Sequence, residues 1–113
     1  MKVKTAEAVE SKTVEVPGAV GAKIRLLIHK ADGAGNFYMR QFDIAPGGCT
    51  PRHEHLWEHE VFVLDGGGTA VSAEGDKAVS AGMCVFVPPG EVHQFRAGEK
   101  GLKMLCIIPS SGK

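Results

Sequence analysis

Histidines dominate the part of the sequence that could do chemistry. Three of the five histidines, His53, His55 and His59, lie within residues 51–60, and a fourth, His93, follows in a segment rich in glycine and proline. Neutral imidazole is the commonest protein ligand for transition metals. The cluster therefore suggests a metal site, provided that the fold brings these side chains together.

Strand alternation would place the three clustered histidines on one side of the chain. Side chains of an extended strand point to opposite faces in turn, and His53, His55 and His59 all have odd numbers. A turn at residues 56–57 could interrupt the alternation of side chains. The prediction of a shared face is therefore stronger for His53 and His55 than for His59. The glutamates of the segment have even numbers and would point the other way: Glu54, Glu58 and Glu60.

The elements that must position these residues are predicted to be short strands separated by turns. Runs rich in valine, isoleucine and aromatic residues alternate with glycine and proline clusters, and no amphipathic helix of about ten residues is visible. This pattern predicts an all-β sandwich or barrel. We expect an extended arm over residues 1–22, followed by strands over 23–30, 37–44, 61–64, 69–72, 77–80, 83–87, 92–96 and 102–108.

Glycine and proline are expected to end strands at residues 46–48, 66–68 and 98–101, because these residue types favour turns. The fifth histidine, His29, stands at the end of a predicted strand beside Lys30. We expect it to be an exposed strand histidine rather than a metal ligand.

Composition narrows the function classes. A chain of 113 residues fits one domain over residues 1–113, and 13 basic residues balance 13 acidic ones without a basic block. Nucleic-acid binding is therefore not expected, and apolar runs of about five residues are too short to span a membrane. The three cysteines, Cys49, Cys84 and Cys106, form no disulfide framework. Free thiols favour a reducing, cytoplasmic location.

Two motifs resemble those of the cupin family. From Gly47, five residues lead to His53-x-His55, four more lead to Glu60, and six more lead to Gly67. From Gly82, five residues lead to Pro88-x-Gly90, and two more lead to His93, with Ala97 where the family often has asparagine. These spacings match the first and second cupin motifs. Together with the strands between them, the motifs cover residues 36–108.

The resemblance implies a small β-barrel, the jelly roll or double-stranded β-helix of cupins, with one metal ion inside. The ligands would be His53, His55, His93 and an acid at Glu60, although His59 fits a shorter spacing and strand alternation favours it. The histidine-rich run also resembles small prokaryotic monocupins that bind manganese through four histidines. We therefore expect manganese, with iron, nickel, zinc or copper as alternatives, at His53, His55, His59 and His93.

Four protein ligands on an octahedral ion would leave two positions open for a small molecule, unlike a closed structural zinc site. The leading functional hypothesis is a metal-dependent oxygenase-type enzyme that acts on an unknown small molecule. Arg40 could bind an anionic substrate, although a solvated strand arginine is the commoner role. The expected walls of the cavity are Phe42, Trp57, Phe95, Met104 and Cys106.

Two other classes of function fit the same site. One is a non-catalytic cupin that senses a small ligand or a metal, and the other is a sugar isomerase or epimerase of the cupin type. Small cupins commonly pair through their sheets. We therefore also expect a homodimer in which residues 3–16 or the strand at residues 24–29 extend the partner's sheet.

Overall fold

Antiparallel strands carry most of the chain in the computed structural model, which describes residues 1–112. The sheet order is β1-β2-β3-β7-β4-β5, and β6 pairs with β4. The predicted all-β fold class is confirmed, and no helix in the described part of the chain is long and apolar enough to cross a membrane. In chain order the elements are η1 (Ala6–Ala8), β1 (Lys12–Thr13), β2 (Val20–Ile28), η2 (Lys30–Asp32), β3 (Phe37–Cys49), β4 (His59–Ser72), β5 (Lys77–Ser80), β6 (Cys84–Val87), β7 (His93–Pro109) and η3 (Ser110–Gly112), where η marks a 3₁₀ helix.

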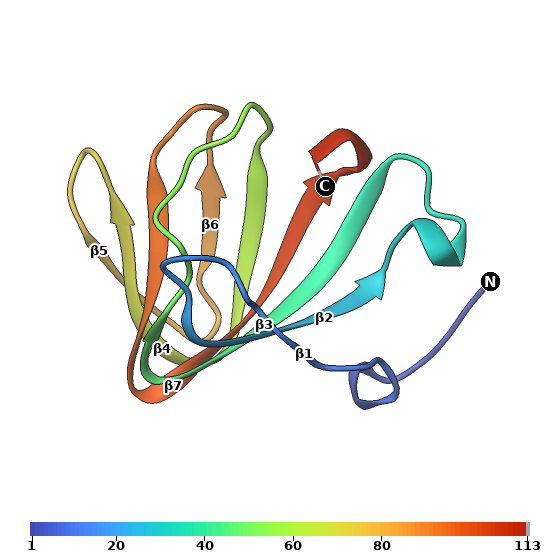
Figure 1. Cartoon of the computed structure of the whole chain (residues 1–113), viewed down its shortest axis with the longest axis horizontal. Helices are drawn as coiled ribbons and strands as arrows, with labels where there is room; N and C mark the ends of the chain where they lie inside the picture. The colour runs from blue at the N-terminus through green and yellow to red at the C-terminus, as the bar shows by residue number, and fades with distance from the viewer. Residues whose placement is uncertain (113) are drawn as a thin grey trace.

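The strands form two walls that meet at one end of the molecule. Figure 1 shows them converging at the bottom of the view and spreading apart toward the top. The long strand β7 bends at the bottom, so that its first half pairs with the end of β4, residues 68–72, and its second half lies beside β3. Residues 102–107 of β7 pair with β3 on one side and with β4 on the other. This strand therefore joins the two walls.

The predicted strand ends at residues 46–48, 66–68 and 98–101 are wrong. β3 runs through 46–48, β4 through 66–68 and β7 through 98–101, with register shifts where the glycine-rich segments bend. A side chain at Gly66 would collide with the backbone oxygen of Gly101, and one at Gly68 would collide with the backbone oxygen of Arg96. Glycine in these strands therefore permits bulges and close passage of the backbone, where the sequence suggested a break.

Alternation along the strands builds the core. In β4, His59, Val61 and Val63 are buried while the residues between them are exposed. Met104 and Cys106 of β7 are each 2% exposed and belong to the same cluster of buried side chains as Val61 and Val63. The inward face of β4 therefore changes from apolar core to histidine at the start of the strand.

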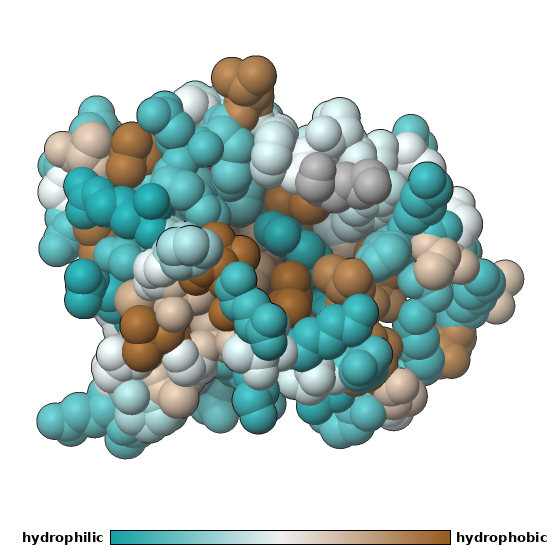
Figure 2. Space-filling view, in the orientation of Figure 1, coloured by the Kyte–Doolittle hydropathy of each residue, from teal (hydrophilic) through white to brown (hydrophobic). Residues whose placement is uncertain are grey.

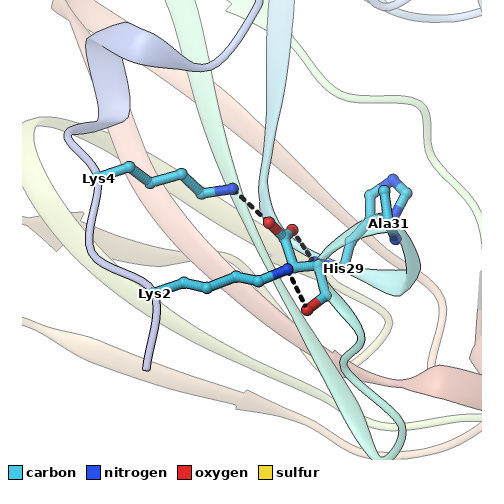
Figure 3. A network of polar contacts seen from close by, with 5 residues as sticks. Lys2, Lys4, His29 and Ala31 are labelled. Atoms are coloured by element: carbon cyan, nitrogen blue, oxygen red, sulfur yellow. Dashed lines mark hydrogen bonds and ion pairs between the residues drawn. The ribbon is translucent and has the colours of Figure 1, made fainter.

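The N-terminal segment lies along its own chain instead of forming a free arm. Arg25 of β2 donates from Nη1 to the carbonyl oxygens of Ala6, at 3.0 Å, and Val9, at 2.6 Å. The ammonium groups of Lys2 and Lys4 reach the turn that follows His29 (Figure 3), where both contact Asp32. The predicted arm over residues 1–22 thus contains η1, β1 and the beginning of β2.

His29 is half-buried and caps η2. Its Nδ1 accepts a hydrogen bond from the backbone N–H of Ala31 at 3.3 Å, and its own backbone N–H donates to the Asp32 carboxylate at 3.0 Å. Its ring is 5.7 Å from that of Tyr38, and it is not part of the histidine cluster described below. The expected exposed strand histidine is therefore a helix cap.

Candidate metal centre

A backbone bridge brings the two histidine segments together. The N–H of His53 donates to the carbonyl of His93 at 3.1 Å, and the N–H of His93 donates back to His53 at 2.9 Å. Residues that exchange both hydrogen bonds in an antiparallel pair present their side chains on the same face. The two rings accordingly lie 4.9 Å apart between centroids.

Buried hydrogen bonds just before His53 hold this bridge in place. The N–H of Thr50 donates to the carbonyl of Phe95, and the N–H of Phe95 donates to Oγ1 of Thr50, each at 2.9 Å. The side-chain amide of Gln94 donates to the carbonyl of Thr50, also at 2.9 Å. The segment that carries the first motif is therefore fastened to the beginning of β7, which carries His93.

His55 and His59 complete a cluster of four rings. The ring of His55 lies 5.0 Å from those of His53 and His93, and it stacks on His59 at 4.2 Å and on Trp57 at 4.3 Å. One ring nitrogen each from His53, His55 and His93 lies within 4.8 Å of the other two, close enough to hold a metal ion. His59 lies beside this trio, with its ring 5.2 Å from that of His93.

Hydrogen bonds at Nδ1 orient three of the four rings. Nδ1 of His93 is 2.8 Å from the carbonyl of Glu91, and Nδ1 of His55 is 3.3 Å from the carbonyl of Trp57. A carbonyl only accepts, so each of these Nδ1 atoms carries the proton and Nε2 keeps its lone pair. In His59, Nδ1 lies 3.2 Å from the Cys106 sulfur, and the buried Nε2 has no partner among residues 1–112.

This arrangement fits a metal ion. Histidine ligands commonly use their second nitrogen on a carbonyl or another acceptor, which fixes the ring and its tautomer. A buried imidazole nitrogen without a hydrogen bond is costly unless something binds it, and Nε2 of His59 is such an atom. The donor set is all nitrogen, which suits transition metals rather than calcium or magnesium.

Burial favours the neutral form of His53, His55 and His59. Loss of water, together with the charges of neighbouring histidines and Arg40, lowers the pKa of His59 to about 3 and that of His53 to about 4. The pKa of His55 is lowered for the same main reason. Neutral imidazole is the form that binds metals. These rings therefore need not lose a proton to bind a metal at neutral pH.

The metal-free protein should lose stability in acid. The pKa of His59 is about 3 in the folded protein, against an ordinary value of 6.5. Between these two pH values the imidazole is protonated in the unfolded chain and neutral in the folded chain. The stabilisation is complete above pH 6.5 and declines as the pH falls. We expect the free energy of unfolding to fall by about 3 kcal/mol between neutral pH and about pH 4.

Urea unfolding in the presence of a chelator, repeated across this pH range, measures the effect. His59→Gln should make the curve shallower, since glutamine does not titrate, while His53, whose pKa is also lowered, keeps part of the dependence on pH. A wild-type curve that is already flat between pH 7 and about pH 4 would contradict the burial of a neutral His59.

The acidic alternative to His59 points elsewhere. Glu60 is exposed on the face of β4 opposite to His59, where its register partners are Phe86 of β6 and Ile107 of β7. Glu54 and Glu58 are exposed as well. The structure thus separates His59 from Glu60 in the way that strand alternation predicts, while the choice of His59 as a ligand stays a prediction.

A cavity of about 470 Å³ adjoins the four histidines. Figure 2, drawn in the orientation of Figure 1, shows a hollow near the middle of the molecular surface, where hydrophobic and hydrophilic side chains lie together. The cavity is lined by all four histidines and by all six residues that the sequence suggested for the pocket: Arg40, Phe42, Trp57, Phe95, Met104 and Cys106.

Part of the cavity wall was not foreseen. Val14, Glu15 and Val16 line it from the N-terminal segment, and Gly112 lines it from the C-terminal turn, where it packs against the ring of Trp57. The alternation of Val14-Glu15-Val16 before a Pro-Gly turn is a weak strand signal that could have suggested a wall. Among the described residues that line the cavity, Glu15 is the one carboxylate.

Arg40 is not the solvated strand arginine that is commoner in general. Its Nη2 donates to the sulfur of Cys106 at 3.0 Å, and its guanidinium carbon lies 5.2 Å from the centre of the Phe42 ring. The same sulfur lies next to Nδ1 of His59, so it can accept hydrogen bonds from both groups. Burial raises the pKa of the Cys106 thiol, and the nearby Arg40 opposes this rise.

Removing this sulfur should weaken metal binding. Cys106→Ala leaves Nδ1 of His59 without its hydrogen-bond partner, so the ring loses the contact that orients it, and we expect affinity for a divalent metal to fall about 10-fold. Competition with a metallochromic chelator measures the change. Cys84→Ala, at an exposed cysteine, should leave the affinity unchanged, and an unaffected Cys106→Ala variant would refute the orienting role.

Comparison with known proteins supports the resemblance seen in the sequence. Residues 40–108 match the Cupin domain family. The polyketide cyclase RemF from Streptomyces resistomycificus is 35% identical, with a TM-score of 0.92, and the match covers 97% of this chain and 80% of that one. A cupin 2 conserved barrel domain protein from Rhodopseudomonas palustris is 26% identical, with a TM-score of 0.84, covering 100% and 82% of the two chains.

A curated relative is matched over a shorter stretch. The 1-methylthio-D-xylulose 5-phosphate methylsulfurylase of Rhodospirillum rubrum is 34% identical over 71 residues, which is 62% of this chain and 46% of that protein. The chain thus matches about half the length of that enzyme. The family match spans most of the chain and includes both histidine motifs, and the fold agrees with solved cupin structures. The protein belongs to the cupin family.

Proposed function

We propose that the protein is a metal-dependent enzyme that binds one divalent transition metal through His53, His55, His59 and His93. The observation that carries this proposal is the use of Nδ1 in His55, His59 and His93, which leaves each Nε2 available beside one cavity. Manganese is the ion that the resemblance favours. Zinc, iron, nickel and copper also suit nitrogen donors.

The cavity supports chemistry on a small, oxygen-bearing molecule. When bound, a metal ion would supply a Lewis acid that polarises a carbonyl oxygen. The chain's own contribution is an apolar enclosure, with Phe42, Phe95 and Met104 among its walls. Such walls exclude water and strengthen electrostatic interactions inside the site. Glu15 at the cavity wall is the candidate to accept a proton from the substrate.

Among reaction types, we propose carbonyl chemistry of the cyclisation or enolisation kind. The identity of 35% with a polyketide cyclase, over nearly the whole of this chain, supports this choice. The oxygenase-type reaction expected from the sequence remains the second candidate, because the all-nitrogen donor set also suits redox-active iron and copper. The two differ in their need for dioxygen.

Exchange of a carbon-bound proton tests the proposal. The metal-free protein is loaded with manganese, zinc or iron, and hydrogen–deuterium exchange at the benzylic carbon of phenylacetone is followed by NMR, with and without oxygen. We expect exchange that needs metal but not oxygen, that is retained with zinc and that is lost in His93→Ala. Glu15→Gln should slow it.

The other outcomes discriminate between the alternatives. Oxygen consumption with loss of the ketone, seen with manganese or iron alone, would favour the oxygenase. A thermal shift on ketone addition, without exchange under any metal, would favour a binding module and contradict the enzyme.

A further inference from the structure

Arg40 is a cation in the cavity, and the residues that the structure describes offer it no acidic partner. No carboxylate among residues 1–112 forms an ion pair with it, and its buried Nε has no hydrogen-bond partner there. We propose that the cavity takes a small organic anion, with an apolar body and a carboxylate group that Arg40 binds. This inference rests on the proposed function in one respect: it assigns the anion to the cavity that adjoins the proposed metal centre.

The chemistry of the guanidinium supports an anionic partner. Arginine stays protonated at any working pH and presents five N–H donors in a plane that matches a carboxylate. In the described part of the chain its polar contact is with the Cys106 sulfur, a weak acceptor, and one face lies over Phe42. A charge taken from water is costly unless it is paired and hydrogen-bonded. A carboxylate would supply both.

The position of Arg40 couples the anion to the metal centre. The Cys106 sulfur lies 3.0 Å from Nη2 of Arg40 and 3.2 Å from Nδ1 of His59. The guanidinium is therefore one side chain away from the cluster, on the cavity wall shared with all four histidines. A molecule held by Arg40 at its carboxylate would have its remaining atoms beside the histidines.

The rest of the lining selects an apolar body. Val14, Ile24, Phe42, Phe95 and Met104 line the cavity, together with one face of the histidine cluster. Its volume of about 470 Å³ falls in the ordinary range of small-molecule sites, ~300–1,000 Å³. Apolar walls, combined with an arginine that has no ion-pair partner in the described part of the chain, fit an aromatic or branched aliphatic acid better than a sugar.

A pair of nearly isosteric ligands tests this inference. Binding of 4-tert-butylbenzoate and of the neutral 4-tert-butylbenzamide is measured by isothermal titration calorimetry and by quenching of Trp57, the single tryptophan of the chain. Its ring stacks on His55 at the cavity wall, so it reports occupancy. Both ligands are titrated into zinc-loaded and metal-free protein. We expect the wild type to prefer the carboxylate at least tenfold in both forms.

Arginine variants locate the source of the preference. Arg40→Gln should bind the two ligands about equally, and Arg40→Lys should keep part of the preference because it keeps the charge. The matched control is Arg96→Gln, since Arg96 is an exposed arginine of β7 that does not line the cavity. It should behave as the wild type. Circular dichroism of each variant checks folding, and Arg40→Lys serves alone if Arg40→Gln does not fold.

The outcomes separate this inference from the proposed metal centre. A preference that persists in folded Arg40→Gln, or unchanged affinities in Arg40→Lys, would overturn the role of Arg40. Equal affinity for the two ligands in the wild type, or no binding of the carboxylate at millimolar concentration, would also overturn it. Failure to bind zinc, with the preference intact in metal-free protein, would contradict the proposed metal centre and leave the anion site standing.

Discussion

Replacement of His93 by alanine should abolish stoichiometric metal binding. His93 is 5% exposed, its backbone pairs with His53, and its Nδ1 is held by the carbonyl of Glu91. The substitution removes a preoriented nitrogen from the trio of His53, His55 and His93, whose ring nitrogens lie close enough together to hold a metal ion. Loss of a group that only orients a metal ligand lowers affinity by up to about 100-fold. Because His93 is itself a proposed ligand, we expect His93→Ala to lower affinity for manganese or zinc at least about 100-fold. Elemental analysis after gel filtration, together with calorimetric titration, measures the loss.

Two control variants make this result specific. His29→Asn changes the histidine that caps η2, outside the cluster, and asparagine is itself a good capping residue. Glu60→Gln removes the acid that the family spacing would use. Both should bind metal as the wild type does. If Glu60→Gln lost the metal while His59→Gln retained it, the four-histidine assignment would be wrong.

Substitution of Gly68 by alanine should destabilise the fold strongly. A Cβ at this position would overlap the backbone oxygen of Arg96 on the paired strand β7. Backbone cannot move aside as a flexible side chain can, so the β4–β7 pairing must shift where β7 leads from His93 into the barrel. We expect the free energy of unfolding to fall by about 3 kcal/mol, measured by urea unfolding at neutral pH.

Gly35→Ala is the matched control. Gly35 has no atom within 4 Å of the position that its Cβ would take, so the same chemical change meets open space and should alter stability little. Equal stability of Gly68→Ala and the wild type would show that the strands do not pass as closely as the structure indicates.

The parts of the site that the sequence predicted depend on local periodicity and on motif spacing. His59 and Glu60 are neighbours in sequence, and alternation was enough to anticipate that β4 buries one and exposes the other. The meeting of His53 with His93 followed from the order and spacing of two motifs typical of cupins. Neither prediction needed the register of distant strands.

The orientation of Arg40 did need that register. Arg40 of β3 stands opposite Cys106 of β7, and this pairing puts the guanidinium beside the sulfur. No local pattern distinguishes such an arginine from a solvated one. The contribution of Val14 and Val16 to the cavity was hidden for the same reason, because the segment lines the cavity through tertiary contacts. The glycine-rich bends of β3, β4 and β7 resembled turns because glycine serves both purposes.

Anomalous diffraction from crystals of the metal-loaded protein tests the four-histidine centre most directly. The account predicts one ion per chain, bound by the Nε2 atoms of His53, His55, His59 and His93 at ~2.0–2.2 Å, with the Nδ1 of His59 still on the Cys106 sulfur. An ion bound by the Glu60 carboxylate with His59 turned away, or an ion found outside this cluster, would contradict it.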